Sequence, residues 1–77
     1  MTIEVGSQVQ GRVTNITNFG AFVDLGDNKT GLVHISEIAD HFVKDPTTVV
    51  KVQQQVMVRV IEVDSIRERI SLSMKRL

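Results

Sequence analysis

Valine, isoleucine and threonine supply 26 of the 77 residues, whereas alanine and leucine together supply six. β-branched side chains lose rotamer freedom in a helix, and they pack well on the pleated surface of a sheet. No other property of the sequence limits its fold as strongly. The bias predicts an all-β domain.

Length and the absence of cysteine narrow the possibilities further. A chain of 77 residues supports one core, so we treat residues 1–77 as a single domain. Without cysteine it has no disulfide, no thiolate metal site and no cysteine nucleophile. Apolar runs are too short to span a bilayer, and the opening residues MTIE lack the basic and apolar regions of a signal peptide. We therefore expect a cytoplasmic protein.

Apolar and polar residues alternate in five short stretches, which is the pattern of strands with one buried face. In the fourth stretch the apolar phase passes from Val60 directly to Ile61, and this slip of one residue predicts a β-bulge or a sharp bend. The five predicted strands are residues 8–16, 21–25, 31–35, 55–63 and 69–74.

The segment between the third and fourth strands breaks the alternation. Ser36 is a candidate cap for a short helical turn over residues 37–39. Asp45-Pro46 predicts a second turn over residues 46–50, because proline suits the first helical position. We therefore predict a five-stranded antiparallel Greek-key OB-fold barrel with a short helical segment between strands three and four.

Phe22 is out of phase with the apolar face of its strand, residues 21–25. Phe19 precedes Gly20, and a glycine there lets the chain bend so that both rings reach one surface. One interpretation is a platform on which the bases of a single-stranded nucleic acid stack. The alternative is that Phe22 packs beneath a loop or at a barrel end. A stacking ring must be open to solvent, which separates the two.

The net charge is zero, whereas domains that bind nucleic acid are usually basic. The charge is unevenly distributed, with a balance of −3 over residues 20–45 and of +3 over residues 65–77. A basic last strand beside two aromatic rings would form a groove for a phosphate backbone. The alternative is an ordinary solvated strand face.

Catalytic and metal-binding interpretations find little support. Ser36 is too close to His34 in sequence for a catalytic triad. His34 and His41 are seven residues apart and match no zinc-binding spacing, even with Asp40 and Asp45 nearby. A surface histidine that stacks or forms hydrogen bonds is the better interpretation of His34. The sequence predicts a binding domain without a cofactor, and not an enzyme.

Five blocks occur in a recognisable order: GRVTNI at residues 11–16, FGAFVD at 19–24, GLVHIS at 31–36, VIEVD at 60–64 and RISLSM at 69–74. Together they resemble the S1 domain, the RNA-binding repeat named after the largest protein of the small ribosomal subunit. The resemblance extends over about residues 5–75. It implies a five-stranded OB barrel that binds single-stranded RNA.

By motif position, the resemblance implies one RNA-binding face. On it Phe19, Phe22 and His34 form the stacking group. Asp64 and Arg69 line the same face, with Arg67 as the alternative to Arg69 because the turn before it varies in length within the family. Residues 53–55 read QQQ where family members commonly have glycine and then an acidic residue. The cations expected near phosphates, besides these arginines, are Arg12 and Lys75.

The segments HFVKDP at residues 41–46 and VVKV at 49–52 are most similar to the C-terminal S1 domain of Tex-type transcription accessory proteins. The N-terminal portion is also similar to the last domain of polynucleotide phosphorylase. Both are much larger proteins, so we expect a domain of a larger parent that is monomeric in isolation. The alternative is a small stand-alone bacterial S1 protein.

The expected partner is single-stranded RNA, bound with little sequence preference, with single-stranded DNA bound more weakly and no membrane contact. The alternative is an OB barrel that docks on proteins of the ribosome or the transcription machinery. The zero net charge also suits that second role.

Overall fold

The computed structural model describes residues 3–77. Residues 1–2, which belong to the opening segment MTIE that we do not expect to be a signal peptide, lie outside the described residues. No helical segment in the described range is long and apolar enough to cross a membrane. The predicted strands are confirmed to within two residues at each end. In chain order the elements are β1 (Gln8–Thr17), β2 (Gly20–Gly26), β3 (Lys29–His34), η1 (Ile35–Glu37), η2 (Pro46–Thr48), β4 (Gln55–Asp64) and β5 (Arg69–Ser73).

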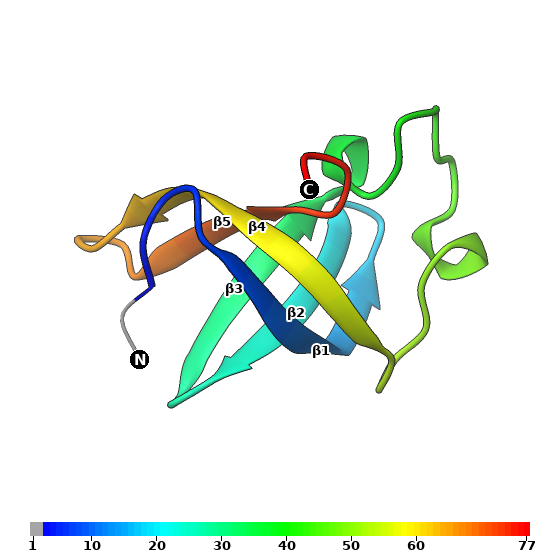
Figure 1. Cartoon of the computed structure of the whole chain (residues 1–77). Helices are drawn as coiled ribbons and strands as arrows, with labels where there is room; N and C mark the ends of the chain where they lie inside the picture. Colours follow the sequence, from blue (N-terminus) through cyan, green and yellow to red (C-terminus); the bar gives the residue numbers. More distant parts are fainter. Residues whose placement is uncertain (1–2) are drawn as a thin grey trace.

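The strands form one closed barrel in the order β1-β2-β3-β5-β4 (Figure 1). Four neighbouring pairs are antiparallel, and the pair of β3 with β5 is parallel. A closed ring with an odd number of strands cannot alternate direction all the way round, so one pair must run in the same direction. The predicted OB-type barrel is confirmed, with this one departure from an all-antiparallel sheet.

Inward-facing side chains alternate with exposed ones along the strands, as the sequence pattern predicted. The connection between β3 and β4 contributes two further apolar residues to the interior. The buried cluster consists of Val13, Ala21, Val23, Leu25, Val33, Ile38, Val50, Val56, Val58, Val60 and Leu72.

The predicted irregularity in β4 is confirmed. Its pairing with β5 shifts register between Val60 and Glu62, which leaves Ile61 as the extra residue of a bulge. The turn before β4 contains Gln53 with a φ of 75°, in the left-handed region that glycine usually occupies. The turn therefore contains a residue in the left-handed conformation, and this residue is a glutamine and not a glycine.

Both helical turns between β3 and β4 are of the 3₁₀ type. The first has the predicted length but begins two residues earlier, and the second has three residues where five were predicted. The prediction that Ser36 caps the first one is wrong. His34 is the capping residue, because its Nδ1 accepts a hydrogen bond from the backbone N–H of Ser36 at 3.1 Å. Asp45 caps the second turn, as its position before Pro46 indicated, and hydrogen bonds from Thr47 lower the pKa of its carboxyl group.

The C-terminal residues fold back over η1. The Arg76 guanidinium donates two hydrogen bonds to the mostly buried Glu37 carboxylate, at 2.9 and 3.0 Å. The N–H of Met74 also donates to the Glu37 carbonyl oxygen at 2.9 Å. The hydrogen bond from Arg76 lowers the pKa of Glu37 although burial opposes this shift. These contacts attach the tail to the connection.

We predict that Arg76→Ala lowers the free energy of unfolding by about 1–3 kcal/mol, because a buried carboxylate loses its charged donor. A lowered folded-state pKa means that this stabilisation is present above the ordinary Glu pKa and is lost as the pH falls through the folded-state value. Urea unfolding at pH 7 and in steps down to pH 3 measures both effects. Lys51→Ala, a change at an exposed residue, is the control. Equal stability and equal acid sensitivity of the two variants would contradict the prediction.

Candidate nucleic-acid interface

A row of outward-facing residues crosses three strands of the barrel. Phe22 of β2 is paired with Leu32 of β3, and Leu32 is paired with Ser71 of β5. The next residue in each strand points into the core and is buried, so these three side chains face outward. Their alignment makes one surface from strands that are distant in sequence.

The two predicted stacking rings lie together on this surface. Phe19, at the turn between β1 and β2, and Phe22 line an open groove of about 660 Å³. Phe19 is 72% exposed and Phe22 is 36% exposed. Phe22 is therefore accessible and is not enclosed beneath a loop. We name this hollow the aromatic groove; it is lined chiefly by Thr17, Phe19, Phe22, Leu32, Arg69 and Ser71.

Arg69 joins the aromatic groove to a neighbouring hollow of about 470 Å³ at the turn between β4 and β5. Asp64 lines that second hollow and is paired in register with Arg69. Arg67 lines neither hollow, and its Nε lies 3.9 Å from the Asp64 carboxylate. Of the two arginines considered for this face, Arg69 is the one whose position fits.

Asp64 also organises the turn that carries these arginines. Its Oδ1 accepts hydrogen bonds from the backbone N–H groups of Ile66 and Arg67, both at 3.1 Å. An acceptor at this position satisfies two donors that no strand partner reaches. Asp64 therefore has a structural role beside any contact with a ligand.

His34 is exposed at the end of β3 and is paired with Gly20, next to Phe19. Its Nδ1 accepts a hydrogen bond from the Ser36 backbone N–H and lies 2.8 Å from the Ser36 hydroxyl oxygen. A backbone amide can only donate, so Nδ1 is the unprotonated nitrogen and the neutral ring carries its proton on Nε2. The ring is thus oriented by its own helical turn, and Nε2–H is its available donor.

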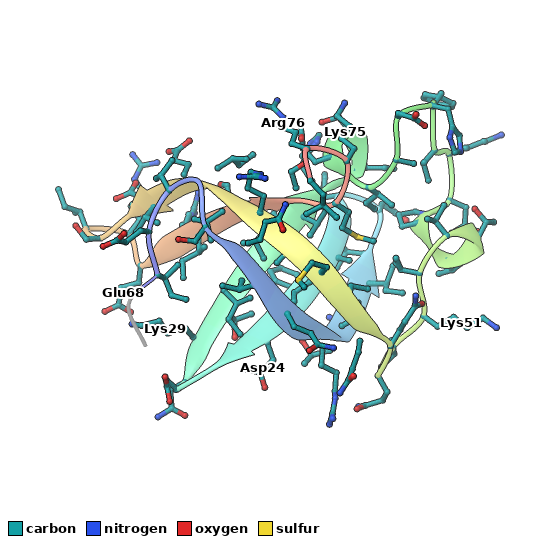
Figure 2. All side chains as sticks on the ribbon, in the orientation of Figure 1. Asp24, Lys29, Lys51, Glu68, Lys75 and Arg76 are labelled. Carbon is teal, nitrogen blue, oxygen red and sulfur yellow. The ribbon has the colours of Figure 1, made fainter. Side chains whose placement is uncertain are left out.

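Neither Arg12 nor Lys75 lines the aromatic groove, and the predicted stacking residue His34 is not part of its lining either. Arg12 lines a separate hollow with Asp24 and Gln55. Lys75 lies in the C-terminal tail, at the opposite end of the barrel from Glu68 (Figure 2). The prediction of a basic last strand is wrong in detail, because β5 ends at Ser73 and Arg69 is its only charged residue.

Leu32, Thr17, Thr30 and Ser71 line the groove but were not among the predicted site residues. The outward position of Leu32 could have been predicted from the sequence. Like Phe22, it alternates with a residue that points into the core, so its side chain must lie on the outer face. The positions of Thr17 and Ser71 depend on which strands become neighbours, and local sequence pattern does not report this.

Comparison with known families matches residues 2–75 to the S1 RNA binding domain. The chain belongs to this family. Both rings lie in the residue blocks that suggested the family, and those blocks fall within the matched range.

Three bacterial relatives show where such a domain occurs. YabR of Bacillus subtilis is 57% identical over 99% of this chain and 59% of its own length. Protein tex of Bordetella pertussis is 56% identical over 91% of this chain and 9% of its own length. The polyribonucleotide nucleotidyltransferase of Halothermothrix orenii is 53% identical, with coverages of 96% and 10%. The predicted similarities to Tex-type proteins and to polynucleotide phosphorylase are confirmed, and the chain spans less than two thirds of each relative.

Two solved structures share the fold. A chain in the crystal structure of the a/eIF2alpha–aDim2p–rRNA complex of Pyrococcus horikoshii superimposes with a TM-score of 0.92 at 36% identity, over 99% of this S1 domain and 46% of that chain. Mycoplasma genitalium RNase R, in complex with ribose methylated single-stranded RNA, gives a TM-score of 0.73 at 27% identity, with coverages of 91% and 13%.

For Asp64 we predict a difference between two substitutions. Asp64→Ala removes the acceptor for two backbone donors and should lower the free energy of unfolding by about 1 kcal/mol, as the loss of a cap does. Asp64→Asn keeps an oxygen in the same place and should stay within a few tenths of the parent. Chemical denaturation measures both. Equal losses in the two variants would show that the negative charge, and not the acceptor, stabilises the turn.

Proposed function

We propose that this S1 domain holds single-stranded RNA, with little sequence preference, in the aromatic groove. The observation that carries the proposal is the pair of accessible rings, Phe19 and Phe22, in one groove beside Arg69. An accessible ring in a single-strand site contributes about 1–3 kcal/mol per stacked base. Every base has an aromatic face, so binding led by stacking tolerates different sequences.

Charge has a secondary role in the groove. Arg69 is accompanied there by Glu68, so few phosphates are neutralised. Binding to single strands loses affinity with a log–log salt slope of about −0.7 for each phosphate contacted, and a shallow slope is therefore expected here. His34 adds its oriented Nε2–H beside Phe19.

The hydroxyl groups of Thr17, Thr30 and Ser71 favour RNA over DNA in this proposal. All three residues line the groove. The ribose 2′-hydroxyl is the group by which a protein distinguishes the two polymers, and side-chain hydroxyls can donate to it and accept from it. Single-stranded DNA should therefore bind more weakly.

The chain matches 9–59% of the length of its relatives, so its cellular role is proposed at the level of a module. We place it in the cytoplasm as the part of a larger protein that retains RNA by raising its effective concentration. The RNase R complex with single-stranded RNA, which contains a similar domain, supports this role. Binding, without catalysis by the domain itself, is the activity we assign.

The experiment is a titration of labelled single-stranded RNA by fluorescence anisotropy at low and moderate salt. Replacing Phe19 and Phe22 together by alanine should weaken binding by at least ten-fold, since each stacked base contributes about 1–3 kcal/mol. Far-UV circular dichroism should remain that of the parent. Ile66→Ala, at a 94% exposed apolar residue outside the groove, is the matched control.

Two results would contradict the proposal. The double variant would bind RNA like the parent if the rings had no part in recognition. The parent itself would give no saturable signal at either salt concentration if the barrel docked on a protein partner instead.

A further inference from the structure

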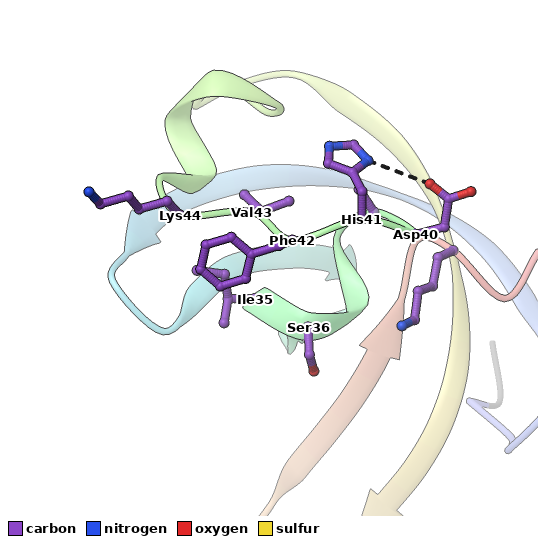
Figure 3. A pocket seen from close by; sticks show the side chains of 9 residues that line it. Ile35, Ser36, Asp40, His41, Phe42, Val43 and Lys44 are labelled. Atoms are coloured by element: carbon purple, nitrogen blue, oxygen red, sulfur yellow. Dashed lines mark ion pairs between the residues drawn. The ribbon is translucent and has the colours of Figure 1, made fainter.

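A further hollow lies beside the connection between β3 and β4 (Figure 3). It shares no lining residue with the aromatic groove. It has a volume of about 410 Å³, and its apolar lining includes Ile35, Ala39 and Val43. Phe42 also lines it and is 87% exposed, more than either ring of the aromatic groove. We name this feature the connection hollow. An aromatic side chain so open to solvent contributes little to the core.

The charge around the connection hollow differs from that of the aromatic groove. Lys44 and Lys75 both line it, from elements distant in sequence. The one carboxylate in the lining, that of Asp40, lies 3.5 Å from Nδ1 of His41 (Figure 3). The lining therefore has a surplus of positive charge, whereas in the aromatic groove Arg69 is balanced by Glu68.

The two hollows adjoin each other. The Ile35 N–H donates to the carbonyl oxygen of Phe19 at 2.8 Å, and these two residues line different hollows. Ser36, in the lining of the connection hollow, is hydrogen-bonded to His34. The turn between β1 and β2 lies beside η1 (Figure 1). A strand that leaves the aromatic groove past Phe19 and His34 thus reaches the connection hollow directly.

We propose that the connection hollow is a second nucleotide-binding subsite for single-stranded RNA. A base stacks on Phe42, and the flanking phosphates are held by Lys44 and Lys75. This inference rests on the proposed function, because it takes the same RNA strand beyond the aromatic groove. Phosphate groups of the RNA would account for the two lysines, and a stacked base would account for the exposed ring. A protein partner would not require an exposed ring and two lysines beside a groove that holds RNA.

Oligomers of different length can test the two sites separately, since OB folds bind about 4–16 nucleotides. Oligomers of about four nucleotides fill the aromatic groove only, and those of about twelve also reach the connection hollow. Phe42→Ala should weaken binding of the long oligomer by roughly five-fold or more and leave the short one unchanged. Lys44→Ala combined with Lys75→Ala should reduce the salt slope for the long oligomer by about 1.4, or 0.7 for each phosphate.

The matched controls are Ile66→Ala for the exposed apolar residue and Lys51→Ala for a lysine outside the hollow. Unchanged binding of the long oligomer by the Phe42 and lysine variants, with the short oligomer still dependent on Phe19 and Phe22, would overturn the subsite alone. The same result is expected if the hollow binds a protein. If the variant with alanine at Phe19 and Phe22 bound the short oligomer as tightly as the parent, the proposed function would be overturned instead.

Discussion

The proposed binding face depends on one strand pairing, that of β3 with β5, which closes the barrel. The strands approach closely there: a Cβ added to Gly31 would lie 2.5 Å from Leu72 Cδ1, so the fully buried leucine uses the space that glycine leaves. The pairing sets Ser71 beside Leu32 and brings Arg69 to the groove that contains the rings. A site built from three strands therefore has the rigidity of the closed core beneath it.

Much of this arrangement was predictable, because alternation with a period of two reports which side of a sheet each residue faces. It gave the five strands, the bulge after Val60 and the outward position of Phe22. It did not give the cap of η1, because His34 has a side-chain acceptor that competes with the usual capping residues. Nor did alternation predict where the positive charge lies. Arg76 forms an ion pair with Glu37, and only the tertiary structure shows this contact.

The zero net charge acquires a physical meaning from the structure. Phe19 and Phe22 lie where one arginine and one glutamate balance, whereas two lysines face one aspartate in the lining of the connection hollow. Stacking depends weakly on salt, whereas phosphate contacts depend on it strongly. Under the proposed function, a neutral domain of this design would hold RNA by its bases first. In the same proposal, a parent protein that supplies further contacts would raise the effective concentration of the strand.

The central claim is that RNA lies across β2, β3 and β5. Amide chemical-shift changes on titration with an RNA of about four nucleotides test it most directly, because they report on every strand at once. The account predicts that the largest changes fall on Phe19, Phe22, Leu32 and Arg69. Changes scattered over the barrel, or gathered on the opposite face around Gln10 and Met57 of β1 and β4, would contradict it.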